Sequence, residues 1–385
     1  MATRIVNLAA TPNPLPAHFL RGGTSKGIFI NRCYLPPDKR DWDRIFLGIM
    51  GSPDGEYGRQ LDGMGGGISS LSKVVVVGPP QDPWKNADVE YTFAQVGVRD
   101  SVVDYSGNCG NLSSMVGVFA VDQDLCPHPA SSDRVLPSSL TVRALNTNTS
   151  KIIETTFPVA VPGTVAKLDL EQASIAGVPG KASAIVLDFL EPAGAGTGKL
   201  LPTGSAIDTL PSPGGSVQAS LVDATNPSIF VHDANLNSAL GLAPFAPLDY
   251  SDPRVLDFLE TIRQAGAVRM GLDPSAQAQP KIAVLSMPDE GDSAADIVVL
   301  ALSMGVVHKA VPMTLALCLG VASNVPNSIP WRIMKEDGKD STHMLRVRHP
   351  GGVVEVGAEF KADGTVRSAK AIRTGRRLME GLVYW

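Results

Sequence analysis

Hydrophobic positions along the chain form short runs that predict many strands and few helices. Lys73 is followed by four valines, a continuous apolar strand that stops at Gly78-Pro79. His18 to Asn31 predicts a strand, a tight glycine turn and a second strand. Further strands are expected at residues 91–98, 140–145, 152–161, 216–222, 228–231, 281–286 and 297–302.

Two almost wholly apolar stretches predict core helices at about 110–122 and 311–321, the second with Pro312 in its first turn. Amphipathic helices are expected at 41–51 and 252–267. Each core helix follows a group of strands and a short polar segment. This shared order predicts two similar domains, with both helix N-termini pointing into one cleft.

Composition supports a compact protein with many turns. Of 385 residues, 44% are hydrophobic and 18% charged, with 38 glycines and 30 prolines. Residues 191–215 are rich in Gly, Pro, Ser and Ala and carry little charge, which is typical of a linker or lid. We therefore expect domains at 1–190 and 216–385, with the last strand able to return to the first domain.

Charge and motifs exclude several classes of function. The net charge of −5 and the lack of a basic block argue against nucleic acid as a partner. No apolar run is long enough to span a membrane, and four scattered cysteines without CxxC fit a reduced, cytoplasmic compartment. The histidines lack metal-ligand spacing, and no GxGxxG links a strand to a helix. No metal site is therefore expected, and hydrolase and nucleotide-dependent functions have little support.

Cys109 is a candidate for chemistry because it lies in Gly-Asn-Cys-Gly-Asn, just before the first core helix. A helix N-terminus lowers the pKa of a thiol and attracts a carboxylate. The flanking glycines permit close approach of the backbone. The alternative is a buried, inert cysteine.

Lys73 is the second candidate. Apolar neighbours remove water from its amine and disfavour the charged form, which would make the lysine a competent general base. The alternative is an ordinary lysine at a strand end with its amine in solvent.

Two further segments could bind an anion. The turn at Arg21 to Gly27 offers charge and hydroxyl donors to a carboxylate, although it could also be a plain hairpin. His308 and Lys309 precede the second core helix and could be substrate ligands; His308 could equally be a core histidine.

Four separated segments resemble the PrpF family, in the right order and nearly end to end. They are 18–27 (HFLRGGTSKG), 72–74 (SKV), 106–111 (SGNCGN) and 376–381 (RRLMEG). The resemblance implies an α+β fold like that of diaminopimelate epimerase, in which two domains each curl a mostly antiparallel sheet around a central helix. It also implies a cofactor-free isomerase acting on small unsaturated di- or tricarboxylic acids in the cleft between the domains, and leaves room for a homodimer.

The resemblance assigns roles to individual residues. Lys73 would be the base, and Cys109 the partner acid or a polar group that holds the intermediate. The residues expected to bind substrate are Arg21, Thr24, Ser25, Gly66, Ser69, Ser70, Ser72, Asn108, Gly110, Asn111, His308, Lys309 and Thr314.

The sequence differs from the family pattern at one position, and two other functions remain as alternatives. Family members often carry Thr-Gly where this chain has Thr314-Leu315, which signals a different substrate. An epimerase of the same fold would need a second cysteine in a matching turn, and none is found. An accessory protein that binds a partner dehydratase is the other alternative.

Overall fold

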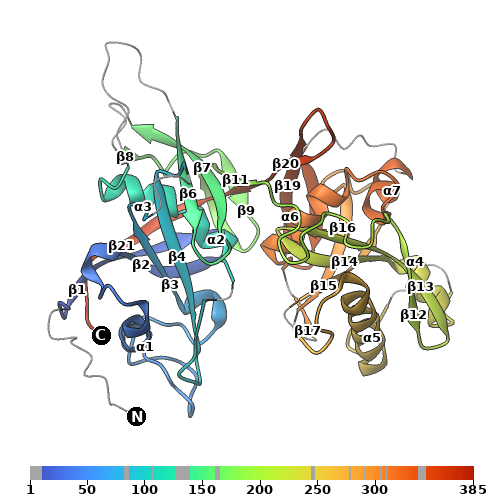
Figure 1. Cartoon of the computed structure of the whole chain (residues 1–385), viewed down its shortest axis with the longest axis horizontal. Helices are drawn as coiled ribbons and strands as arrows, with labels where there is room; N and C mark the ends of the chain where they lie inside the picture. The colour runs from blue at the N-terminus through green and yellow to red at the C-terminus, as the bar shows by residue number, and fades with distance from the viewer. Residues whose placement is uncertain are drawn as a thin grey trace. The chain divides into compact units, whose positions relative to one another are not determined.

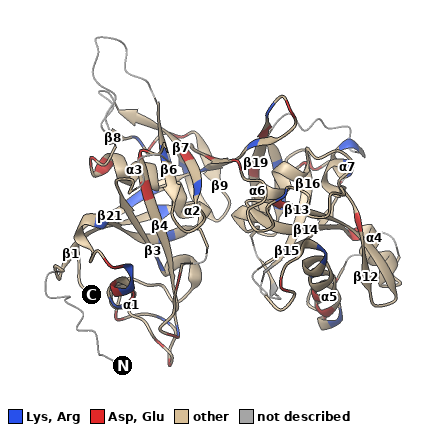
Figure 2. Cartoon of the chain, viewed as in Figure 1, with Lys and Arg blue, Asp and Glu red and all other residues tan. Residues whose placement is uncertain are grey.

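The computed structural model describes residues 11–81, 86–105, 107–126, 139–160, 165–243, 248–276, 279–289, 291–303, 306–308, 310–336 and 344–385. The chain divides into two compact units (Figure 1). Unit 1 comprises Met1–Leu187 and Ile372–Trp385, and unit 2 comprises Asp188–Ala371. In both units, Lys and Arg are interspersed with Asp and Glu (Figure 2).

Unit 1 contains a curved, mostly antiparallel sheet and a separate two-stranded sheet. Its strands are β1 (Leu15–Gly22), β2 (Ser25–Asn31), β3 (Lys73–Gly78), β4 (Val89–Val96), β5 (Val103–Asp104), β6 (Ser139–Asn146), β7 (Lys151–Ala160), β8 (Val165–Ala166), β9 (Ala173–Ile175), β10 (Val178–Ala182) and β21 (Gly375–Val383); β11 (Ile185–Leu190) begins here and ends in unit 2. Strands β9 and β10 form the two-stranded sheet. The main strands pair in the order β21-β1-β2-β3-β4-β6-β7. Only β2–β3 and β4–β6 are parallel.

The first core helix of unit 1 is shorter than predicted. In place of one helix over 110–122, the structure has α2 (Gly110–Ser113) and α3 (Val116–Asp122). The hydroxyls of Ser113 and Ser114 bond back to the carbonyls of Cys109 and Asn111, and Met115 N–H bonds three residues back, to Leu112. Serine hydroxyls compete with helical hydrogen bonds in this way, so the helix breaks after one turn.

Helix α3 is nevertheless central to unit 1, since it is buried from Val116 to Val121. A Cβ at Gly117 would lie 2.2 Å from Thr155 Oγ1 and 2.8 Å from Phe157, so only glycine permits this approach of helix to sheet.

Helix α1 (Trp42–Met50) packs on the same sheet. It lies one residue inside each end of the prediction, between Asp41 and the left-handed Gly51.

Unit 2 repeats the plan. Its strands are β12 (Asp208–Ser212), β13 (Gly215–Ala224), β14 (Asn226–His232), β15 (Lys281–Ser286), β16 (Ile297–Ser303), β17 (Val306–Val307), β18 (Leu345–His349), β19 (Gly352–Phe360) and β20 (Val366–Arg373), the last of which ends in unit 1. Its helices are α4 (Asp233–Ala239), α5 (Pro253–Met270), α6 (Met313–Ala322) and α7 (Ile329–Glu336). Short 3₁₀ helices in unit 1 lie at Arg32–Tyr34, Lys39–Asp41 and Ser69–Leu71.

The helices of unit 2 differ from prediction at their ends. Helix α6 begins at Met313 because Pro312 is its N-cap and not part of the first turn. Helix α5 runs three residues beyond the predicted end and stops at Gly271, whose φ of +74° is the left-handed conformation that ends many helices. The expected sheet around a central helix is confirmed in each unit.

The two sheets share one sequence of pairings. From β1 to β7 the successive pairs are antiparallel, parallel, antiparallel, parallel and antiparallel. The pairs from β13 to β19, through β14, β15, β16 and β18, follow the same series. In each unit the core helix is inserted between the fourth and fifth of these strands.

A three-residue cluster marks the repeat in unit 1. Asp88 N–H donates to Arg143 O, and Arg143 N–H returns a bond to Asp88 Oδ2. Arg143 also pairs with Glu154, which lies opposite it on β7.

The same residue types recur in unit 2. Asp296 N–H donates to Arg346 O, Arg346 N–H bonds Asp296 Oδ2, and Glu355 lies opposite Arg346 on β19. The sequence analysis found only a resemblance of element order, because these residues are too far apart in the chain to reveal a pattern.

Residues 191–215, which we expected to form a linker or lid, contain strand β12. The whole stretch belongs to unit 2, and Leu210 of β12 is fully buried. The carboxylate of Asp223 accepts bonds from the backbone N–H groups of Gly196 and Thr197, which fastens the glycine-rich part to β13. High Gly and Pro content here reflects tight turns against a sheet.

The end of the chain belongs to unit 1, where β21 pairs along β1 from Leu15 to Gly22. Within the described ranges, no helix combines the length and apolar character needed to cross a membrane.

Candidate active site

The predicted glycine turn packs directly on the helix that follows Cys109. A Cβ at Gly22 would lie 2.2 Å from the carbonyl oxygen of Asn111, and one at Gly23 would lie 2.4 Å from Asn111 Oδ1. Gly23 also has a φ of +49°, which favours glycine. The two glycines therefore allow the β1–β2 turn to approach α2.

This approach brings four of the predicted residues together. Asn111 Nδ2 donates to Thr24 Oγ1 at 3.1 Å and to Ser25 Oγ at 3.4 Å. Cys109 Sγ lies 3.9 Å from the same Ser25 hydroxyl. Gly110 is buried as the first residue of α2. The thiol, two hydroxyls and an amide thus form one polar cluster in unit 1.

Arg21 connects the turn to Thr374 through hydrogen bonds. Its Nη1 donates to the carbonyls of Gly23 and Thr374 and to the Thr374 hydroxyl. Burial lowers the pKa of Arg21, and the nearby charge of Arg376 lowers it further. The Nη1 group of Arg21 therefore links the turn to the C-terminal segment.

Arg373 is a member of the cluster that the sequence analysis missed. It is 4% exposed, and its Nε donates to Asn111 Oδ1 at 3.1 Å. Burial lowers the pKa of Arg373 to about 10, while the adjacent Cys109 acts in the opposite direction. The guanidinium therefore still carries its charge at neutral pH. No sequence signal marks it, because it lies 262 residues from Asn111.

The amine of Lys73 is buried among uncharged groups. The side chain leaves the first position of β3, and the residue is 8% exposed. Its Nζ donates to Gln95 Oε1 at 2.5 Å and lies 4.9 Å from the centre of the Phe93 ring. Because the residue is buried, the alternative of a solvated strand-end lysine is wrong. No carboxylate in the described part of the chain forms an ion pair with the amine.

Gln95 is held so that its oxygen faces the amine. Gln95 Nε2 donates to the carbonyl oxygens of Ser69 and Ser72, which leaves Oε1 turned toward Lys73. Gln95 was not among the predicted site residues, because only the antiparallel register of β3 and β4 places it opposite the lysine.

The loop before Lys73 contains the other predicted hydroxyls. Ser72 is fully buried and donates to Gln60 Oε1 and Ile68 O, so its hydroxyl is engaged within the loop. Ser69 and Gly66 are exposed and Ser70 is half-buried. Ser72 thus fixes the loop, and the carbonyl of Ser69 accepts a hydrogen bond from Gln95.

One face of β4 connects the lysine to the cysteine segment. Tyr91, Phe93 and Gln95 alternate along the strand and so share a face. At one end of this row Gln95 bonds Lys73, and at the other the Tyr91 hydroxyl donates to Asn108 Oδ1 at 3.2 Å. Burial raises the pKa of Tyr91, so the hydroxyl keeps its proton as a donor.

A second route joins the same two segments through β2. A Cβ at Gly27 would lie 2.8 Å from Lys73 O, 3.3 Å from Lys73 Cβ and 2.7 Å from Leu112 of α2. Gly27 and Ser25 lie two residues apart and share a face of β2. Lys73 and Cys109 therefore border the same face of the unit 1 sheet.

Unit 2 holds the remaining predicted ligands. His308 is exposed after β17, and its Nδ1 bonds the backbone of Ala310, so it is not a core histidine. Thr314 is half-buried in the first turn of α6, and its carbonyl accepts from Thr225 Oγ1. Lys309 lies outside the described residues. A role for these residues with the unit 1 cluster stays a prediction.

The repeat gives Lys73 a counterpart. Lys281 opens β15 as Lys73 opens β3, and these two strands pair in parallel with β14 and β2, respectively. Burial lowers the pKa of Lys281.

The expected helix N-terminus at Cys109 is only one turn long. A four-residue helix aligns few peptide dipoles, so it stabilises negative charge much less than a long helix would. The positive charge next to Cys109 comes instead from Arg373.

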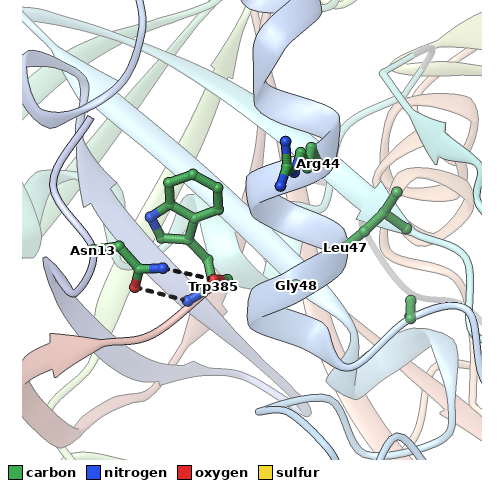
Figure 3. Close-up of a pocket in the computed structure, with 6 residues that line it drawn as sticks. Asn13, Arg44, Leu47, Gly48 and Trp385 are labelled. Carbon is green, nitrogen blue, oxygen red and sulfur yellow. Dashed lines mark hydrogen bonds between the residues drawn. The ribbon is translucent and has the colours of Figure 1, made fainter. Parts of the chain in front are cut away.

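A pocket in unit 1 lies apart from the predicted site residues. It has a volume of about 560 Å³ and is lined by Asn13, Arg44, Leu47, Gly48, Ser52 and Trp385, none of which was predicted as a site residue (Figure 3). Over the described ranges, no group of three His, Cys, Asp or Glu side chains is arranged to hold a metal.

Comparison with known proteins agrees with the motifs. The model of the family described as PrpF protein matches residues 13–385. The 3-methylitaconate isomerase of Eubacterium barkeri is 38% identical, over 96% of this chain and 97% of that protein. The 2-methyl-aconitate isomerase of Shewanella oneidensis is 34% identical, over 95% and 96%.

A solved structure agrees as well. The crystal structure of a methylitaconate-delta-isomerase matches with a TM-score of 0.82 at 35% identity, and the match covers 97% of this chain and 96% of that one. The family model and the relatives both span nearly the whole chain, and the resemblance drawn from its motifs is confirmed. The chain belongs to the PrpF family.

Proposed function

We propose that the protein is a cofactor-independent isomerase that moves a double bond in a small unsaturated di- or tricarboxylic acid. The observation that carries the proposal is the buried amine of Lys73, which is bonded to an amide oxygen and lies over an aromatic ring. An amine that is withdrawn from bulk water and held in one direction by an amide oxygen is placed for proton transfer with a bound substrate.

The reaction begins at an allylic C–H beside the alkene. The amine of Lys73 removes this proton, and the electron pair of the C–H bond spreads over the allyl unit and its conjugated carboxylate as a dienolate. The proton then returns to the far end of the allyl unit, so the double bond moves and no atom is gained or lost. One base suffices when both transfers occur on one face.

The Cys109 cluster would serve the carboxylate side of the intermediate. Thr24, Ser25 and Asn111 present hydroxyl and amide groups, and Arg373 adds a positive charge. Such groups stabilise the negative charge that develops as the proton leaves. Cys109 acts as partner acid or holds the intermediate by a hydrogen bond.

Ligands from unit 2 complete the proposal. His308, Lys309 and Thr314 are the residues of unit 2 that we propose bind a second carboxylate of the substrate. We place the protein in the cytoplasm.

The test is a panel of acids followed by ¹H NMR in heavy water. The panel holds cis-aconitate, trans-aconitate, 2-methylaconitates, itaconates and alkylated maleates. New vinyl or methylene signals together with deuterium at an allylic carbon support the proposal. Exchange only at a saturated stereocentre would indicate an epimerase instead, and binding without any exchange would indicate an accessory protein.

A further inference from the structure

Arg373, Asn111 and Ser25 form a chain of hydrogen bonds that ends beside the Cys109 sulfur. Arg373 Nε donates to Asn111 Oδ1 at 3.1 Å, and Asn111 Nδ2 donates to Ser25 Oγ at 3.4 Å. Ser25 Oγ lies 3.9 Å from Cys109 Sγ. Arg373 and Ser25 are 4% and 3% exposed, so the chain is built into the interior of unit 1.

The direction of this chain follows from the donor alone. A guanidinium has N–H donors and no acceptor, so Asn111 must turn its oxygen toward Arg373. Its NH₂ group then faces the hydroxyls of Thr24 and Ser25, whose oxygens accept. Because each hydroxyl oxygen is engaged as an acceptor, its own proton is left to donate elsewhere.

The backbone holds the partners at this spacing. A Cβ at Gly23 would approach both Asn111 Oδ1, at 2.4 Å, and Arg373 Cδ, at 3.1 Å. Gly23 N–H also donates to Thr374 O, next to Arg373 in sequence. The turn, α2 and the C-terminal segment therefore form one packed unit in which Asn111 has little freedom to rotate.

We propose that Arg373 is a positioning residue: through Asn111 it directs the hydroxyl protons of Thr24 and Ser25 toward a carboxylate bound beside the Cys109 sulfur. The cation and the directed donors together make this position selective for an anionic group over a neutral one of equal size. The inference rests on the proposed function, since it assigns one carboxylate of the substrate to this position.

Alkylation of Cys109 by two reagents tests the inference without a substrate. Iodoacetate carries a carboxylate and iodoacetamide a neutral amide of nearly the same size. In both cases the cysteine sulfur attacks the CH₂ carbon and iodide leaves. The ratio of the iodoacetate rate to the iodoacetamide rate at one cysteine therefore measures how strongly that site prefers a carboxylate over a neutral amide. Cys33 is free and exposed in the same unit and serves as an internal reference.

In the native protein we expect the iodoacetate-to-iodoacetamide ratio at Cys109 to exceed that at Cys33 by roughly tenfold, the effect of about one charge-assisted hydrogen bond. Peptide mass spectrometry measures both cysteines in the same sample. Arg373→Met and Asn111→Leu should each reduce the Cys109 ratio to near the Cys33 value. The double variant should lose no more, because the two residues act in series.

Two variants separate positioning from charge and from misfolding. Arg373→Lys keeps a cation but lacks the planar Nε donor. Its iodoacetate-to-iodoacetamide ratio at Cys109 should therefore lie between those of Arg373→Met and the native protein. Arg377→Met removes a cation from the same C-terminal segment, where it pairs with Asp122, and should leave the ratio unchanged. If Arg373→Met does not fold, Arg373→Lys and Asn111→Leu still decide the question.

Three results would overturn the inference: equal ratios at Cys109 and Cys33 in the native protein, a raised ratio retained in folded Arg373→Met, or a raised ratio retained in Asn111→Leu. The last would mean that the cation acts directly and not through Asn111. A raised ratio that depends on both residues, in a protein that isomerises no acid in the NMR panel, would support this inference and remove the proposed function.

Discussion

Lys73 and Gln95 face each other across antiparallel strands, with the lysine Nζ 2.5 Å from the glutamine Oε1. The glutamine amide is held in turn by two backbone carbonyls of the preceding loop. The glutamine oxygen therefore orients the amine. This contact leads to the predictions for Lys73 and Gln95 below.

Replacing Lys73 by methionine should reduce allylic proton exchange into heavy water by 10³-fold or more, in the upper range of general-base effects. Deuterium incorporation followed by NMR measures it. Lys39→Met is the matched control, since Lys39 also contacts an uncharged oxygen, Thr92 Oγ1, and an aromatic ring, Trp42. Exchange that survives in Lys73→Met would exclude this lysine as the base.

Replacing Cys109 by serine should cost less, about 10- to 100-fold in kcat, if the thiol is an auxiliary acid or hydrogen-bond donor. Steady-state rates with the preferred acid decide this. A loss as large as that of Lys73→Met would favour a mechanism with two essential proton-transfer groups.

Gln95→Glu should move the pH profile of kcat upward by about one pH unit, because a carboxylate facing the amine favours the ammonium form. Gln95→Leu removes the acceptor without adding charge and should lower kcat with little shift of the profile. The paired profiles are the measurement. Equal profiles for both variants would show that Gln95 does not face the catalytic amine.

Gly27→Ala should destabilise the protein by about 1–3 kcal/mol, because the added methyl group meets the Lys73 carbonyl and Leu112 at under 3 Å. Urea unfolding measures the change. At Gly381 an added Cβ meets nothing within 4 Å. Gly381→Ala should therefore change stability by about 0.5 kcal/mol or less. Similar losses in both variants would contradict the close packing of β2 on Lys73.

Asp54 should make the loop before Lys73 sensitive to acid. Backbone N–H groups of Arg59, Gln60 and Tyr57 lower the pKa of Asp54 from 3.8 to about 2. A lowered carboxylate pKa gives stability that is present above pH 3.8 and lost as the pH falls through about 2. Asp54→Asn should flatten the fall of the urea midpoint in this window. An unchanged slope would contradict the prediction.

Much of the candidate site was visible in the sequence because its parts are local. Three short segments carry most of it: the turn from Arg21 to Ser25, the segment around Cys109 and the strand after Lys73. In each, the residues that shape the backbone and those that could take part in chemistry lie within ten positions of one another. Hydrophobic runs also predicted strands β1–β4, β6, β7 and β13–β16 and the positions of the core helices, because buried strands and helices show characteristic patterns of apolar residues.

Contacts over long sequence separations could not be read in this way. Gln95 depends on the register of two strands, and Arg373 reaches Asn111 only because β21 returns the chain end to unit 1. The break after α2 depended on two serine hydroxyls that could have pointed elsewhere.

The sequence by itself determined the family, the strand-rich fold and the two side chains proposed for proton transfer, because each rests on local pattern or on motif spacing. Tertiary structure alone decided which groups surround those side chains: an amide and an aromatic ring at Lys73, and a buried guanidinium near Cys109. The physical reason is that a side chain's electrostatic surroundings are set by neighbours in space, and these neighbours come from strands and chain ends far away in sequence.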